Sequence, residues 1–435
     1  MLTVLHNIWW LLVLIGVMIL IHELGHYWAA RFFDVRVETF SFGFGPRLFG
    51  FKKGETDFRF SAILFGGYVK MVGDQAGDES AADPRGFMAK PRWQRLIIAF
   101  AGPLMNILLA VAILTGLFMV RYPKIPTTVN PTVGYLLPDG AAAKAGVKEG
   151  DRIVQIGNTV DPTWDDVAMK EVSSAGRPLD VWVERGGQRQ HLTVTPVLDP
   201  RNYIGIAGWL EQYETHVGAV SPDKPAEQAG LRRGDILISA NGQPIRSSPQ
   251  FIELIAANAG NPLVLGYKRD GKLQQMTVTP RHEPVEGRWM IGVRLEPPSV
   301  SLPLPQALSE SVKRNAKSAT LIYQFLEGIV ERKMSARSVD GPIRIAQLSG
   351  EAAKEGPSAF FELMSMVSLN LAIFNLLPIP ILDGGVILML LLEMFMRRDL
   401  SLPVKEAVFK VGFVFIMALV VFVIYNDISK MLPPS

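Results

Sequence analysis

The amino-acid sequence predicts an α-helical polytopic membrane protein with four transmembrane helices, a membrane-associated β-hairpin region and two β-rich domains outside the membrane. Three observations lead to this fold class. Hydrophobic residues make up 49% of the 435 residues and charged residues only 20%, and the mean hydropathy is +0.22. The apolar residues are collected in four discrete runs, which is typical of membrane-spanning helices. A pattern of small residues and turns occurs twice between the second and third runs.

The four apolar runs give the expected spans, which are Leu2–Ile21, Leu96–Val120, Leu363–Leu382 and Val411–Tyr425. The last run is short and reaches full length only if it begins near Ala407. The first run is interpreted as a retained helix rather than a signal peptide. No Lys or Arg precedes it, and ionisable residues follow it where a cleavage site would stand.

Basic residues in the short loops predict the orientation. Eleven Lys and Arg residues occur between Arg31 and Arg95, which places this loop in the cytoplasm of a bacterial cell. Both termini and the long segment between the second and third spans are then periplasmic, in the inner membrane. The net charge of +3, from 44 basic and 41 acidic residues, gives no sign of a nucleic-acid-binding protein.

The long middle segment contains an internal repeat. The run Ala145–Asp151 recurs as Ala229–Asp235, an offset of 84 residues (229 − 145 = 84). The shared pattern A-G-[VL]-x-x-G-D resembles PDZ domains in the permuted form found in bacterial proteases. This resemblance implies that Ile204–Ile206 and Ile291–Val293 border a peptide groove in each copy. A role as a spacer or size filter without a peptide ligand is equally compatible with the pattern.

The sequence His22-Glu23-Leu24-Gly25-His26 indicates a metal site. Histidines at i and i+4 share one helix face, and Glu23 beside them could accept a proton from a metal-bound water. The chain has no cysteine, so nitrogen and oxygen atoms must hold the metal. The other histidines lie in the exterior domains or at the far end of the first span, and Asp383 is therefore the expected third ligand. A helix cap at the membrane surface is the plainer role for Asp383.

Two prolines interrupt the third span. Pro378 and Pro380 each remove a backbone donor, and a broken helix inside a membrane is tolerated where it is packed in protein or lines a cavity. Asn375, just before them, is expected to contact the substrate. An ordinary proline kink is the alternative.

The cytoplasmic loop has the alternation of a strand up to Leu64 and then continues into Gly66, Gly67 and Tyr68. A β-hairpin that dips toward the metal could pair with an unwound substrate and hold it extended, and the two glycines would permit close backbone approach. A surface ribbon that only caps the metal site is the alternative.

The motifs H-E-L-G-H at 22–26 and N-x-x-P-x-P-x-L-D-G at 375–384, together with the repeated insertion, resemble the site-2 proteases over essentially the whole chain. The resemblance implies an intramembrane zinc metalloendopeptidase that binds Zn²⁺ through His22, His26 and Asp383 and uses Glu23 as its general base. It also implies that Asn375, Pro378 and Pro380 contact the substrate. The implied partners are single-pass membrane proteins, such as an anti-sigma factor already cut once, and remnant signal peptides.

Two other classes of protein remain open at this stage. A membrane-anchored PDZ adaptor with a structural or inactive metal site would also use the repeat, although structural zinc needs no adjacent base. A transporter would explain broken helices, but the paired segments of an inverted repeat are missing from the sequence.

The expected division of the chain follows from these features. Residues 1–124 hold the first two spans, the H-E-x-x-H motif and the hairpin loop. Residues 125–210 and 211–298 form the two PDZ domains, 299–358 form amphipathic connecting helices, and 359–435 hold the last two spans. No specific role is expected from the sequence for residues 302–331.

Overall fold

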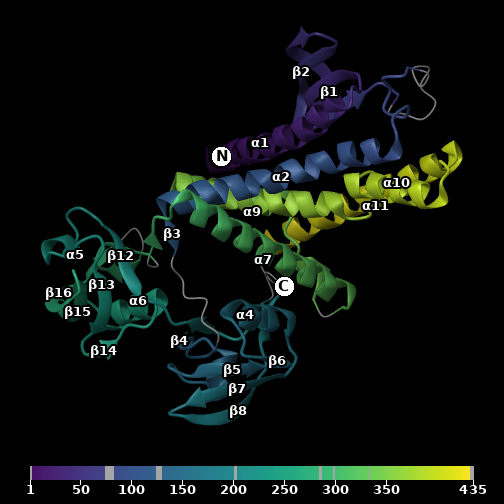
Figure 1. Cartoon of the computed structure of the whole chain (residues 1–435). Helices are drawn as coiled ribbons and strands as arrows, with labels where there is room; N and C mark the ends of the chain where they lie inside the picture. Colours follow the sequence, from purple (N-terminus) through teal and green to yellow (C-terminus); the bar gives the residue numbers. More distant parts are fainter. Residues whose placement is uncertain are drawn as a thin grey trace.

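The computed structural model describes residues 2–73, 83–123, 130–199, 203–283, 287–296, 299–332 and 334–431. Within these residues, four helices are long and apolar enough to cross a membrane, as the sequence predicts. They are α1 (Leu2–Phe32), α2 (Arg92–Val120), α9 (Pro357–Leu376) and α11 (Leu402–Met431). These helices run side by side with the shorter α10 (Asp383–Met396), and the two β-rich units lie to one side of them (Figure 1).

Helix α2 has close neighbours on more than one side, because small residues lie where these helices meet it. Gly25 of α1 faces the backbone of α2, and a Cβ atom at Gly25 would collide with the carbonyl group of Ala101. On the other side of α2, Ser365 and Ser368 of α9 donate hydrogen bonds to backbone carbonyls of α2. Small residues and side-chain hydroxyls of this kind replace the hydrophobic driving force that helices lose inside a membrane.

The cytoplasmic loop forms a bent hairpin of β1 (Val37–Lys53) and β2 (Thr56–Met71). The first half of β1 pairs on both sides, because Thr39 lies opposite Lys70 on one side and opposite Asp57 on the other. The Gly67–Met71 segment of β2 is consequently an edge of the sheet. The hairpin runs back along α1, where Phe42 reaches Gly16.

The outer surface of this hairpin is strongly apolar, which suits contact with lipid. Its exposed large hydrophobic residues are Phe44, Leu48, Phe49, Phe51, Phe60, Ile63 and Leu64.

The third apolar run is divided in the structure. Helix α9 ends at Leu376, and α10 begins only at Asp383, because the two prolines between them cannot continue the helix. The turn is tight: Ile381 has a φ of 84°, and Cβ atoms at Gly384 and Gly385 would collide with carbonyl groups of the turn. The glycines therefore let the start of α10 pack directly onto the turn.

The first β-rich unit begins at β4 (Val133–Leu136) and ends at β11 (Trp209–Glu211). Between them lie α3 (Ala141–Lys144), β5 (Arg152–Ile156), β6 (Thr159–Val160), α4 (Trp164–Ser173), β7 (Leu179–Arg185), β8 (Gln188–Val194), β9 (Val197–Leu198) and β10 (Gly205–Ile206). The second unit repeats this order in β12 (Thr215–Val220), α5 (Pro225–Gln228), β13 (Ile236–Ala240), β14 (Gln243–Pro244), α6 (Ser248–Ala257), β15 (Leu263–Arg269), β16 (Lys272–Val278), β17 (Arg281–Glu283), β18 (Arg288–Met290) and β19 (Val293–Glu296). Each unit has its own core of buried aliphatic residues.

Backbone hydrogen bonds fix the correspondence between the two units. The Ala142 N–H donates to Ala207, and 84 residues further on the Ala226 N–H donates to Ile291 in the same way. The counterpart of Ile291–Val293 is therefore Ala207–Trp209. The expectation that Ile204–Ile206 plays this part is wrong by three residues, because the similar Ile-Gly-Ile sequence stands one short strand too early.

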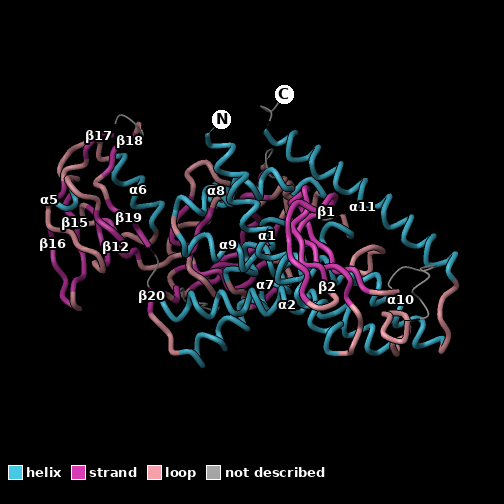
Figure 2. Tube along the Cα trace, turned by 90° about the horizontal axis from the view of Figure 1, so that it is seen from above, coloured by secondary structure: helices cyan, strands magenta, loops and turns pink. Residues whose placement is uncertain are grey.

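Residues after the second unit lead back to the helical part. Strands β3 (Tyr122–Pro123) and β20 (Ser299–Val300) pair, so α7 (Leu304–Val330) begins beside the end of α2. Viewed from above, the second unit lies apart from the helices, close to β20 (Figure 2). Helix α7 packs on α2 through a narrow polar face, in which the Ser311 and Thr115 hydroxyls are 2.7 Å apart.

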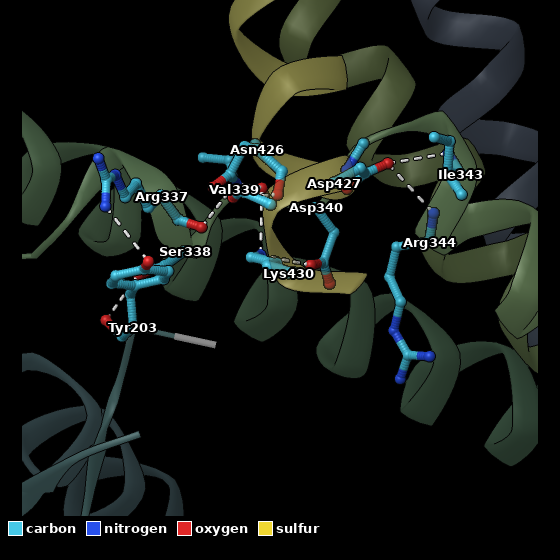
Figure 3. A network of polar contacts seen from close by, with 12 residues as sticks. Tyr203, Arg337, Ser338, Val339, Asp340, Ile343, Arg344, Asn426, Asp427 and Lys430 are labelled. Atoms are coloured by element: carbon cyan, nitrogen blue, oxygen red, sulfur yellow. Dashed lines mark hydrogen bonds and ion pairs between the residues drawn. The ribbon is translucent and has the colours of Figure 1, made fainter. Parts of the chain in front are cut away.

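A polar network ties the end of α11 to α8 (Pro342–Glu355) (Figure 3). The buried Asp427 carboxylate accepts backbone N–H groups of Gly341, Ile343 and Arg344, at 2.8, 2.9 and 3.2 Å. Asn426 donates to two carbonyl groups in the loop before α8, which contains a short 3-10 helix (Ala336–Ser338). Along most of its length α11 is exposed, so these contacts hold one of its ends.

Candidate metal centre

Three side chains from two helices meet at one point. His22 and His26 lie one turn apart on α1, and Asp383 is the first residue of α10. The Nε2 atoms of the two histidines are 3.2 Å apart. One oxygen of Asp383 lies 3.1 Å from Nε2 of His22, and the other lies 3.4 Å from Nε2 of His26. The predicted third ligand therefore lies beside the two histidines, and this group could hold a metal ion.

The spacing of these atoms suits zinc. Ligands at about 2.0–2.1 Å in a tetrahedral site lie about 3.3–3.4 Å from each other, close to the separations seen here. Asp383 Oδ2 is buried without a hydrogen-bond donor. A Cβ atom at Gly102 of α2 would collide with His26 Nε2 and lie 2.8 Å from His22 Nε2, so this glycine keeps the space before the nitrogens free.

The second nitrogen of each histidine has a partner on α2. The His26 Nδ1–H donates to the carbonyl oxygen of Ile98 at 2.8 Å, which leaves Nε2 free to bind a metal. His22 Nδ1 lies 3.3 Å from the side-chain amide of Asn106, a fully buried residue. Gly102 and Asn106 thus both lie against the histidines.

A cavity of about 960 Å³ opens beside this group. Glu23 lines it together with the two histidines, and its carboxylate accepts the Val69 backbone N–H from the hairpin. The cavity is also lined by four of the residues predicted to contact a substrate, Gly66, Gly67, Tyr68 and Asn375.

The two prolines occupy a different place. Pro378 and Pro380 are not among the described residues that line the cavity. Pro380 packs against α11, where a Cβ atom at Gly412 would collide with it. These prolines therefore shape the turn before Asp383.

A buried ion-pair cluster in the wall of the cavity was not predicted from the sequence. Glu393 of α10 is 1% exposed and lies 2.7 Å from Lys405 of α11 and 3.7 Å from Arg95 of α2. All three line the cavity and join the helices around it. Their separation in sequence, over 300 residues between Arg95 and Lys405, hides this association.

The site combines two imidazoles and one carboxylate around a position that a metal ion could occupy. A further carboxylate lies beside them in a cavity among apolar helices. This combination is that of a metallohydrolase centre in a membrane protein. Comparison with known proteins gives the family. Peptidase family M50 matches residues 10–419. The chain therefore belongs to peptidase family M50, the site-2 proteases, and is a metalloendopeptidase of that type.

Individual relatives match over nearly their whole length. The regulator of sigma-E protease RseP of Salmonella typhimurium is 30% identical over 457 aligned positions, covering 99% of this chain and 100% of that protein. RseP of Escherichia coli is 30% identical, covering 97% and 98%. A Xylella fastidiosa protein named "Putative zinc metalloprotease" is 31% identical, covering 97% and 98%.

A solved structure of a PDZ domain, from an SdrC-like protein of Listeria monocytogenes, is 28% identical. It covers 19% of this chain and 85% of that domain, with a TM-score of 0.18.

Proposed function

We propose that this chain cuts single-pass membrane proteins within or near their transmembrane segments, with Zn²⁺ held by His22, His26 and Asp383. The observation that carries the proposal is the convergence of these three ligands beside Glu23 in a cavity lined by the four apolar helices α1, α2, α9 and α11. Glu23 is the general base. The site-2 protease family and the names of its relatives support zinc as the metal.

Bound zinc would lower the pKa of a water molecule and polarise the scissile carbonyl group. Glu23 takes the proton of the attacking water and passes it to the leaving amine. The Val69 N–H holds the Glu23 carboxylate at the edge of the hairpin, so base and substrate-binding strand are positioned by the same segment.

The hairpin edge holds the substrate in an extended form. A peptide bond inside a helix is shielded, so the substrate must unwind before water can attack. The Gly67–Met71 edge pairs on one side with β1 and borders the cavity on the other, which suits addition of a substrate strand. A side chain at Gly67 would crowd Ile19 and Glu23. Tyr68 and Asn375 line the same cavity.

The substrates and the location follow from the relatives. Proteins named regulator of sigma-E protease support an anti-sigma factor, shortened by a first protease, as one substrate. Remnant signal peptides stay a prediction from the resemblance to site-2 proteases. We place the chain in a bacterial inner membrane, with both termini and the β-rich units periplasmic and the metal centre toward the cytoplasmic side.

The two β-rich units act as PDZ domains in this proposal. Their repeated strand order and the matching loops Ala207–Trp209 and Ile291–Val293 support binding of peptide C-termini. They stand on the exterior side of the helices, where they would meet the shortened exterior end of a substrate.

Cleavage of a single-span substrate with a short exterior segment tests the proposal. The Glu23→Gln variant should bind one zinc ion like the wild type and lose at least about a hundredfold in rate. Glu355→Gln, which removes an exposed carboxylate at the end of α8, is the control and should cleave normally. Equal cleavage by wild type and Glu23→Gln would remove Glu23 from the mechanism. Zinc binding without cleavage by the wild type would favour a membrane-anchored adaptor.

A further inference from the structure

An arginine of the hairpin reaches the substrate-binding edge from the far side of β1. Ser41 of β1 lies opposite Tyr68 on one side and opposite Arg59 on the other. Side chains at directly opposite positions of a sheet lie on the same face, and strands two apart are about 10 Å from each other. Because Ser41 is small, the Arg59 side chain crosses over β1, and its guanidinium group donates a hydrogen bond to the hydroxyl oxygen of Tyr68.

Among the described residues, the Arg59 guanidinium group has no polar partner besides Tyr68. Its Cζ atom lies 5.6 Å from the centre of the Tyr68 ring, and its Nε atom is buried without a hydrogen-bond acceptor. The carboxylate of Asp57, two residues earlier on the same strand, pairs instead with Arg47 at 3.3 Å. A half-buried cation without a counter-charge, in a hairpin with an apolar surface, costs free energy, and such a residue is expected to serve a function.

An aromatic neighbour also fixes Tyr68. The Phe44 ring lies parallel to the Tyr68 ring, with centroids 6.0 Å apart. Phe44 in turn packs directly against Gly66, where a Cβ atom would collide with the ring. Phe44, Gly66 and Tyr68 all line the cavity beside the metal centre, whereas Arg59 is not among the described residues that line it.

The contact with Arg59 leaves the hydrogen of the Tyr68 hydroxyl group unused. A guanidinium group has donors only, so Tyr68 is the acceptor in this contact. Its own O–H must donate elsewhere, and no described residue accepts it. A positive charge at the phenol oxygen also makes the O–H a stronger donor. Because Tyr68 lines the cavity, the acceptor that can reach it there is an oxygen atom of a bound substrate.

We propose that Arg59 is a positioning residue of the substrate-binding edge: it holds Tyr68 so that the Tyr68 O–H donates a hydrogen bond to an oxygen atom of the bound substrate strand. This inference rests on the proposed function. It adds a side-chain donor to the backbone groups of the Gly67–Met71 edge, and it places the control of that donor in a residue outside the cavity.

Cleavage kinetics with the single-span substrate in detergent test the inference. The variants are Arg59→Leu, Tyr68→Phe, which removes only the hydroxyl group, and the double variant. Arg47→Leu is the matched control, because it removes an arginine of the same hairpin that pairs with Asp57. Substrate binding is measured separately on proteins that also carry Glu23→Gln, by fluorescence anisotropy of the labelled substrate.

Each single variant should lower kcat/KM about tenfold, mainly through a higher KM, and the double variant should be no worse than either one. The dissociation constants of the Glu23→Gln proteins should rise by the same factor. Arg59→Lys keeps a donor and should recover part of the loss. Arg47→Leu should cleave like the wild type, and all variants should bind one zinc ion.

Losses that multiply in the double variant would show that Arg59 acts without Tyr68 and would overturn the inference. An unchanged KM and dissociation constant in either single variant would also overturn it. Loss of zinc together with activity would reduce Arg59 to a structural residue.

A wild type that fails to cleave would refute the proposed function. The dissociation constants of the Glu23→Gln proteins would still decide the role of Arg59, because they do not depend on cleavage. Absence of substrate binding by these proteins would overturn the inference as well.

Discussion

A single methyl group decides whether the metal centre can form. Gly102 lies directly against the two metal-binding histidines. A Cβ atom at this position would collide with the Nε2 atoms of both His22 and His26. We expect Gly102→Ala to lose most of its zinc and its cleavage activity, because the histidines cannot keep their positions. Zinc content measured after purification checks this prediction.

Gly116→Ala on the same helix is the control, because a Cβ atom there meets nothing within 4 Å. It should retain zinc and gain up to about 1 kcal/mol in helix stability. A Gly102→Ala variant with full zinc content would show that the helices separate enough to admit the methyl group.

Asn106 orients the expected metal ligand His22 through a hydrogen bond. When His22 binds a metal through Nε2, its Nδ1 carries the hydrogen and needs an acceptor. The Asn106 Oδ1 atom is buried without a partner, so turning the amide brings this oxygen to Nδ1. We expect Asn106→Leu to weaken zinc binding by about 10–100-fold in competition with a chelator.

Asn106→Asp keeps an acceptor oxygen at nearly the same place and should retain most of the zinc affinity. If Asn106→Leu and the wild type compete equally with the chelator, Asn106 serves packing alone.

At the scale of the elements, α11 depends on polar contacts at its ends. Asp427 accepts three N–H groups of the first turn of α8, where the helix dipole favours negative charge. Asp427→Ala should cost about 2 kcal/mol or more and speed hydrogen exchange at the start of α8.

Asp340→Ala is the matched change, since it removes only a half-exposed ion pair with Lys430. Its cost should stay below about 1 kcal/mol. Equal effects of the two variants would mean that the Asp427 hydrogen bonds do not hold α8 and α11 together.

Strand β11 meets α4 and α7 at a site that responds to pH. Burial, helped by Asp165, raises the pKa of Glu211 from 4.5 to about 7, and Lys317 of α7 opposes this rise. The folded state therefore binds more protons than the unfolded state between about pH 4.5 and 7. The contribution of Glu211 to stability is present below this window and is lost as the pH rises through it.

Thermal unfolding at about pH 5 and about pH 8 checks this prediction. The wild type should lose more stability than Glu211→Gln on going to the higher pH, because the variant has no carboxyl group to titrate. The same pH dependence in both proteins would contradict it.

At the scale of the whole molecule, the metal joins the two ends of the chain. His22 and His26 come from the first helix and Asp383 from the tenth, so a bound ion links α1 to α10. Ligand binding to the folded state alone adds about 4 kcal/mol when free metal exceeds its dissociation constant a thousandfold. A strong chelator should therefore lower the unfolding temperature of the wild type.

Asp383→Ala provides the reference for this experiment, because it lacks one ligand and should respond little to the chelator. Equal shifts for the two proteins would place the stabilising metal at another site.

The sequence by itself determined the four apolar helices, the broken third run, the repeat and the H-E-x-x-H motif, because hydropathy, proline chemistry and helical spacing are local properties. It also led to Asp383 by elimination among few possible ligands. Only the tertiary structure decided that Gly102 and Asn106 face the histidines and that Arg95 meets Glu393. These associations join residues from different elements, and only packing of those elements in three dimensions brings such residues together.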